Sequence, residues 1–151
     1  MKTLLPLILI FLVCIACSKT PDTLVSKFDE KQMDAAIAKA KSSVQDFIDE
    51  LQAKNADSYS VKAPITDKHG TEHFWVTDVT YKDGAFSGLI GNDPGIVKNV
   101  KFGQPWTIKK EDISDWMYIK NEMIHGGFTI EPLLGTFPKE EAEAIRSKLV
   151  R

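Results

Sequence analysis

The stretch of residues 112–129 constrains the fold more than any other part of this 151-residue chain. It contains a strand-like run at residues 116–120, a polar turn at Asn121 and Glu122, and a return strand that continues to Ile130. A β-hairpin of this kind is only marginally stable in water by itself. The sequence therefore predicts that the hairpin belongs to a larger sheet, with a helix packed on its apolar face.

A second hairpin is predicted upstream. Residues 72–81 and 85–90 are rich in aromatic and β-branched side chains, and Asp83-Gly84 between them favours a two-residue turn. Period-two alternation divides the first of these strands into two faces. One face should carry Trp75, Val79 and Tyr81, and the other Phe74, Val76, Asp78 and Thr80.

Two shorter segments complete the predicted sheet. Residues 59–65 alternate like a strand, and Pro64 favours a place at the sheet edge because proline cannot donate a backbone hydrogen bond. Residues 106–109 predict a further strand just before the hairpin of residues 112–129. We expect an antiparallel sheet of five to six strands, either strongly bent or closed into a half-open barrel.

Helical periodicity is clearest in residues 30–54. Asp29 and Gln32 form a capping-box pattern at the start. The apolar stripe that follows consists of Met33, Ile37, Ala40, Val44, Phe47, Ile48 and Leu51. This stripe should pack on the sheet, and a second, shorter helix is predicted at about residues 138–149. The elements together define one small α+β domain at residues 28–151.

The N-terminus has the pattern of an export signal. Residues 4–16 form an apolar run of 13 residues, too short to span a bilayer core of about 30 Å as a helix. Residues 14–17, Cys-Ile-Ala-Cys, resemble a bacterial lipobox, with cleavage before Cys17 and a diacylglyceryl group on its sulfur. The resemblance implies a signal peptide at residues 1–16, a lipidated tether at residues 17–27, and a domain that faces the periplasm.

Lipidation of Cys17 has consequences for the mature chain. Cys14 would leave with the signal peptide, so the mature chain would have no free thiol and no disulfide. Ser18 after the lipid cysteine is not aspartate, and the resemblance to enterobacterial lipoproteins then implies export to the outer membrane. Because each buried methylene contributes about 0.8 kcal/mol, several acyl chains hold a protein at a membrane permanently. The membrane is thus an expected partner, through the N-terminal lipid.

The hairpin also resembles a known family. Residues 113–118, Ile-Ser-Asp-Trp-Met-Tyr, followed by residues 126–129, Gly-Gly-Phe-Thr, resemble the signature of the YegJ-like bacterial proteins. Residues 137–144 look like the closing helix of that family. It is a domain family of unknown function, so the resemblance implies no reaction. The hairpin also looks distantly like domains of bacterial toxin-immunity proteins, which is an analogy of fold alone.

Charge and motif content narrow the function classes. The formal net charge is −2, from 19 Lys and Arg against 21 Asp and Glu, and no basic face predicts binding to nucleic acid. The sequence contains no phosphate loop, dinucleotide fingerprint or zincin motif, so we expect no cofactor. Sequence spacing does not bring His69, His73 and His125 together, so no metal site is predicted.

The candidate functional residues cluster in the hairpin. Asp112 and Asp115 lie at the strand entrance, where we expect Asp112 or Ser114 to cap the turn and Asp115 to accept backbone hydrogen bonds. Gly126-Gly127 fits either a backbone nest for an anion or the close approach of a large ring. That ring would belong to Trp116 or Trp75. The full set of candidate binding residues is Asn92, Asp112, Asp115, Trp116, Tyr118, His125, Gly126 and Gly127.

These observations favour a non-enzymatic binding or protein-interaction module, with a protein or a small polar envelope molecule as its ligand. Two alternatives stay open. The first is a cell-wall or ester hydrolase that uses Asp112, Asp115 and His125, and the second is a structural envelope lipoprotein without a discrete ligand. A concave site that holds those three side chains within hydrogen-bond reach would favour the hydrolase, whereas an exposed aromatic patch would favour a binding partner.

Overall fold

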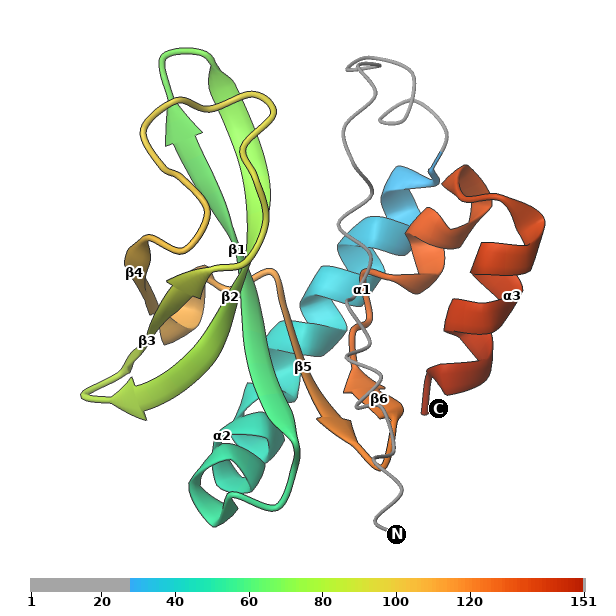
Figure 1. The fold of residues 1–151 in the computed structure, drawn as a ribbon, viewed down its shortest axis with the longest axis horizontal. Coiled ribbons are helices and arrows are strands. Elements are labelled where there is room, and N and C mark those ends of the chain that lie inside the picture. Colours follow the sequence, from blue (N-terminus) through green and yellow to red (C-terminus); the bar gives the residue numbers. More distant parts are fainter. Residues whose placement is uncertain (1–27, 151) are drawn as a thin grey trace, which may run out of the picture.

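The computed structural model describes residues 28–150, which form a small α+β domain around one six-stranded antiparallel sheet (Figure 1). The strands are β1 (Ser58–Asp67), β2 (Gly70–Lys82), β3 (Ala85–Ile90), β4 (Pro105–Lys109), β5 (Asp115–Lys120) and β6 (Met123–Gly126). Their order across the sheet is β4-β3-β2-β1-β5-β6. The predicted fold class is confirmed, and the sheet is open, because β4 and β6 lie at its opposite edges.

In the described part of the chain, three α-helices and two short 3₁₀ segments accompany the sheet. They are α1 (Glu30–Ser42), α2 (Val44–Ala53), η2 (Lys110–Asp112), η3 (Glu131–Thr136) and α3 (Lys139–Lys148). No helix within residues 28–150 has both the length and the apolar character needed to cross a membrane. The predicted signal peptide, the lipid on Cys17 and the tether at residues 17–27 lie outside the described residues.

The prediction of one continuous helix at residues 30–54 is wrong, because the helix is interrupted at Ser43. This residue has φ −107° and ψ 11°, and its hydroxyl donates to the Lys39 carbonyl at 2.8 Å. A serine that bonds back to the preceding turn competes with the helical ladder and bends it. The predicted N-cap is confirmed, since Asp29 Oδ1 accepts the backbone N–H of Gln32 at 3.3 Å.

A β-bulge in β2 contradicts the predicted division of its faces. The pairing with β3 shifts between Thr77 and Thr80, and Asp78 takes a left-handed conformation with φ 52°. The extra residue rotates the strand. Val79 therefore lies in the same core cluster as Phe74, although strict alternation assigns the two to opposite faces.

Pro64 does not mark an edge strand, because β1 lies inside the sheet between β2 and β5. The pairing with β5 ends at Lys62, whereas the pairing with β2 continues to Asp67. The Lys62 carbonyl accepts the Ser114 N–H at 2.7 Å, so the backbone of Pro64, two residues on, faces the same side. Beyond the end of β5, no described strand lies along this side of β1. The N–H that Pro64 lacks is therefore not needed for a hydrogen bond within the sheet.

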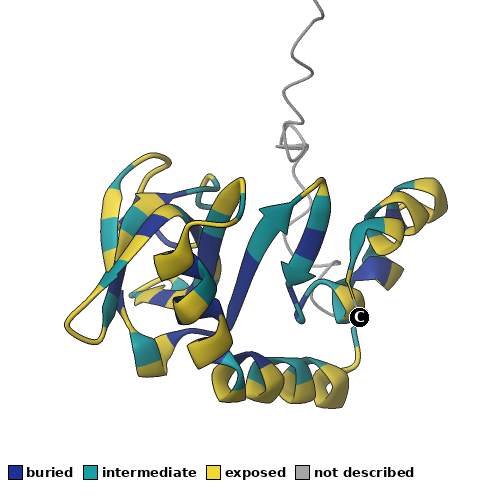
Figure 2. Cartoon of the chain, turned by 90° about the horizontal axis from the view of Figure 1, so that it is seen from below, coloured by how far each residue is buried: buried dark blue, intermediate teal, exposed yellow. Residues whose placement is uncertain are grey.

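The main core lies between the sheet and the N-terminal helices. Phe47 of α2 is fully buried, and its ring lies 5.8 Å from Phe86 and 5.4 Å from Trp116, measured between centroids. α2 has four buried residues, whereas Ala40 is the one buried residue of α1. Figure 2 accordingly shows few dark blue segments in α1. The predicted apolar stripe is thus core in its second half and only partly covered in its first.

The return strand of the hairpin is shorter than predicted, because β6 ends at Gly126 and residues 128–130 form a turn. Gly126 and Gly127 have φ values of 78° and 63°, which redirect the chain away from β5. The C-terminal segment then returns, and the Val150 N–H donates to the carbonyl of Ile124 at 2.9 Å. In Figure 1, α3 lies beyond β6 at one end of the molecule.

Candidate functional site

Trp116 is the residue of the hairpin that joins it to the core. Only 6% of its surface is exposed, and its ring stacks on Phe47 with an angle of 25° between the planes. The indole Nε1 donates to the Ala40 carbonyl of α1 at 3.0 Å. The predicted packing of this hairpin on the N-terminal helical segment is confirmed, with both the apolar and the polar part of the indole in contact.

The glycine pair makes room for this indole. A Cβ on Gly126 would lie 2.5 Å from Cζ3 of Trp116, which is closer than real Cβ atoms come to other heavy atoms. Gly127 donates its N–H to the Trp116 carbonyl at 2.8 Å. Of the two rings considered from the sequence, Trp116 rather than Trp75 is therefore the one that approaches Gly126-Gly127.

Two more rings continue an aromatic column outward from Trp116. Tyr118 lies nearly parallel to the indole, at 6.2 Å and 4°, and His125 lies against Tyr118 at 4.6 Å and 8°. Tyr118 and His125 are directly paired across β5 and β6. Burial raises the pKa of the Tyr118 phenol, and the Glu50 carboxylate adds to the increase. The phenol thus stays neutral at neutral pH.

This column forms one wall of an open groove with a volume of about 800 Å³. Five of the eight candidate residues line the groove, namely Trp116, Tyr118, His125, Gly126 and Gly127. They come from adjacent positions of one hairpin, so the two-residue strand period and the glycine turn together bring them to the same surface.

The opposite wall of the groove was not predicted from the sequence. It consists of residues of α1, including Ala35, Ala36 and Lys39, whereas Leu149 and Val150 extend the hairpin wall beside Ile124 of β6. Lys39 Nζ lies 4.7 Å above the ring centroid of Phe128, so a cation–π contact closes part of the rim. Ala35 and Ala36 are adjacent small residues that lie outside the predicted apolar stripe of the first helix. They were the one sequence signal that α1 has a second contact surface.

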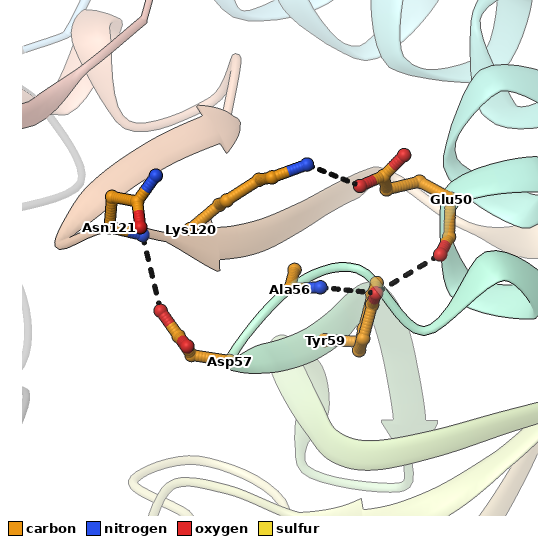
Figure 3. Close-up of polar contacts among 6 residues, drawn as sticks. All are labelled: Glu50, Ala56, Asp57, Tyr59, Lys120 and Asn121. Atoms are coloured by element: carbon orange, nitrogen blue, oxygen red, sulfur yellow. Dashed lines mark hydrogen bonds and ion pairs between the residues drawn. The ribbon is translucent and has the colours of Figure 1, made fainter.

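The tip of the hairpin is fixed to the end of α2 (Figure 3). Lys120 Nζ lies 3.2 Å from Glu50 Oε1, and the Asn121 N–H donates to Asp57 Oδ2 at 3.2 Å. The Tyr59 hydroxyl donates to the Glu50 carbonyl at 3.0 Å. Contacts at the tip and at Trp116 therefore hold this wall of the groove in place without a ligand.

Asp115 begins β5 and is completely buried. Its carboxylate accepts the backbone N–H groups of Trp116, Phe128 and Thr129 and the hydroxyl of Thr129, at 2.7–3.2 Å. The predicted acceptance of backbone hydrogen bonds is confirmed. Burial raises the pKa of Asp115, and the bonds from Thr129 and Trp116 oppose that increase. Asp115 therefore fixes the loop that follows the glycine pair.

A polar cluster extends from Asp115 across the sheet. Lys62 Nζ donates to Thr129 Oγ1 at 3.2 Å and lies 5.5 Å from the ring centroid of Trp75. His73 Nδ1 and Ser114 Oγ are 2.9 Å apart. Burial lowers the pKa of Lys62, an effect that Asp115 partly opposes. Burial also lowers the pKa of His73, with a further contribution from the Lys62 charge.

The remaining candidates lie outside the groove. Asp112 is exposed in η2, and Asn92 Oδ1 accepts the Trp75 N–H at 3.0 Å in the loop after β3. Of the three residues of the hydrolase alternative, His125 alone lines the groove, and no hydrogen bond within residues 28–150 joins it to the two aspartates. In the same part of the chain, no three His, Cys, Asp or Glu side chains gather as a metal ion would require.

The fold and the groove define a small α+β domain with a six-stranded antiparallel sheet and an open groove walled by aromatic side chains. The chain belongs to the family described as "Uncharacterized protein conserved in bacteria (DUF2314)", which matches residues 30–149. The resemblance to YegJ-like proteins is thereby confirmed at the level of the family.

Two curated proteins are similar to the chain in sequence. The chain is 55% identical over 151 residues to the "Uncharacterized protein YegJ" of Escherichia coli strain K12, with 99% of both chains covered. It is also 41% identical over 71 residues to a putative ankyrin repeat protein of Neisseria meningitidis serogroup B, across 46% of this chain and 28% of that protein. No solved structure matches the chain.

Proposed function

We propose that this protein is a non-enzymatic binding module, attached to a membrane through lipid on Cys17, with its groove facing the periplasm. The groove is the observation that supports the proposal, because it gathers five candidate residues around about 800 Å³. That volume lies in the range of sites for small molecules and short peptide segments. Its aromatic faces, small side chains and bare glycine backbone supply contact area for a ligand.

We infer that the ligand is an extended protein segment. The Ile124 carbonyl faces away from β5, since it accepts the Val150 N–H, and ladder alternation directs the backbone groups of Gly126 the same way. Gly126 also lines the groove. A peptide in the groove can therefore combine backbone hydrogen bonds to Gly126 with side-chain contacts to Tyr118 and His125, as in strand-addition recognition.

The hydrolase alternative receives less support. A general acid or base must reach a substrate proton directly or through one water. The carboxylate of Asp115 is instead engaged by three backbone N–H groups and a hydroxyl, and Asp112 lies away from the groove. His125 would then act without either carboxylate partner.

Site-specific photocrosslinking tests the binding proposal. A benzophenone amino acid at Ala35, an exposed groove residue, should form adducts with a defined envelope protein, and mass spectrometry should locate them on one extended segment. The same probe at Thr107, exposed on β4 at the far edge of the sheet, serves as the control. Equal adducts at both positions, or turnover of peptidoglycan or ester substrates that His125→Ala abolishes, would count against a binding module.

Metabolic labelling with a palmitate analogue tests the anchor. Cys17→Ser should lose the label and leave an unprocessed precursor, because thioether formation precedes cleavage at a lipobox. Cys14→Ser is the matched control and should keep the label, since that cysteine belongs to the signal peptide. Equal labelling of both variants would refute lipidation at Cys17.

A further inference from the structure

The groove has a candidate occupant within the chain itself. We propose that the tether, residues 17–27, docks in the groove and competes there with the external ligand. This inference rests on the proposed function, because it concerns the same site, and it adds a means of regulation to it. Four features of the chain support it: the exposed wall of α1, the point where the tether joins it, the length of the tether and the order of its charges.

α1 is a wall that its own domain leaves largely uncovered. In 13 residues it buries Ala40 alone, whereas the shorter α2 buries four residues. Ala35 is exposed and Ala36 is half-buried, and both line the groove. Small side chains at adjacent positions let another backbone come close to the helix, so this wall fits an extended segment better than a bulky helix.

The tether joins the domain at one end of this wall. Along a helix axis, at about 1.5 Å per residue, Ala35 and Ala36 lie about 10–12 Å from Phe28. A chain that turns back at Phe28 and runs extended along α1 covers about 3.3 Å per residue. Leu24 and Val25, the two apolar residues of the tether, then fall about 10–13 Å from Phe28, beside the two alanines.

The same register pairs opposite charges. On the extended path, Asp22 lies about 20 Å from Phe28. Along the helix axis, Lys39 lies about 17 Å from the same residue. Lys19 falls about 30 Å away, and Asp46, an acidic residue of the groove, lies in α2 past the bend at Ser43. Lys39 and Asp46 both line the groove. Apolar and charged positions of the tether thus match the wall in one alignment.

A weak contact is sufficient for this arrangement. A segment linked directly to its site has an effective concentration on the order of millimolar, so a millimolar affinity half-fills the groove. An external ligand then binds with an affinity reduced by the free fraction of sites. Its binding would also release the tether, which could extend about 30 Å between domain and membrane.

Disulfide trapping in residues 17–151, produced without the signal peptide and with Cys17→Ser, tests the docking. This chain has no other cysteine, so introduced pairs report alone. Val25→Cys with Ala36→Cys should cross-link roughly tenfold faster than Val25→Cys with Asp34→Cys, because docking raises the local thiol concentration on the groove side of α1 alone. Asp34 is exposed, lies two positions from Ala36 and does not line the groove, so a tether that is not docked reaches both positions. Equal rates for the two pairs would overturn the proposal.

A second measurement separates this inference from the proposed function. A synthetic peptide of residues 18–27 should bind residues 28–151, which contain the whole described core, and Leu24→Asp in the peptide should abolish binding. Ala36→Arg in the domain should block the peptide and also remove the photocrosslinked envelope partner. Loss of that partner without any binding of the peptide would reject self-docking and leave the binding module standing. Peptide binding without an envelope partner would support self-docking and count against the proposed binding module.

Discussion

The indole N–H of Trp116 donates to the backbone carbonyl of Ala40, 76 positions earlier in the chain. Ala40 is also the one buried residue of α1, so this bond lies where that helix is attached to the sheet. The same indole stacks on Phe47 of α2. One side chain therefore connects β5 to both N-terminal helices and sets the separation of the groove walls.

Replacement of Trp116 should be the most destabilising single change in the hairpin. We expect Trp116→Ala to lower the free energy of unfolding by about 3–5 kcal/mol, through lost burial and the cavity left behind. Phe102 is 57% exposed, and Phe102→Ala should stay within about 0.5 kcal/mol of the parent. Urea unfolding of residues 28–151 measures both, and similar midpoints for the two variants would disprove the role assigned to Trp116.

The glycine pair offers a controlled test of the close approach to the indole. Gly126 and Gly103 have similar φ values of 78° and 74°, but a Cβ meets Trp116 at Gly126 and nothing within 4 Å at Gly103. Gly103→Ala should cost about 1–2 kcal/mol, the backbone penalty alone. Gly126→Ala should cost about 1–3 kcal/mol more, through overpacking. Chemical denaturation giving equal losses for both would contradict the contact with Trp116.

Asp115 should stabilise the fold through its hydrogen bonds. Asp115→Asn keeps one acceptor oxygen and places an NH₂ group against backbone donors, and each buried donor left unsatisfied costs about 1–3 kcal/mol. Asp112→Asn, at an exposed position, should change stability by less than about 0.5 kcal/mol. Hydrogen exchange should show faster opening at the Thr129 amide in Asp115→Asn. Unaltered protection there would mean that the carboxylate does not hold the loop.

His73 should make stability depend on pH below neutrality. Much of its side chain is exposed, yet its Nδ1 edge lies against Ser114, and its pKa in the folded state is lowered. As pH falls through about 6.5, the unfolded chain binds a proton that the folded chain resists, so stability is lost. Between pH 7.5 and 5, the parent should lose more unfolding free energy than His73→Gln. Parallel pH profiles would refute this linkage.

The sequence predicts those features of the fold that depend on local chemistry. Asp83-Gly84 specifies its turn through two left-handed residues, with φ values of 51° and 82°, and Asp29 caps its helix with its own side chain. The break at Ser43 and the bulge at Asp78 were not predicted. The residues around Ser43 would equally suit an unbroken helix, and those around Asp78 an unbroken strand. Such features depend on what packs against them.

The candidate site was only half predictable for the same reason. Tyr118 and His125 share a hairpin, so strand period and turn position bring them together. Ala35 and Leu149 reach the groove from the two ends of the domain, and no spacing rule links them. The bond between Lys62 and Thr129 likewise joins residues 67 positions apart.

The edge of the sheet at β4 is short and poorly suited to pairing with another molecule. β4 has five residues, begins with Pro105, which lacks a donor, and ends with Lys109, which carries a charge. Features of this kind oppose edge-to-edge association of sheets. For a protein concentrated in two dimensions on a membrane, as proposed here, they would oppose aggregation at the crowding that anchoring creates.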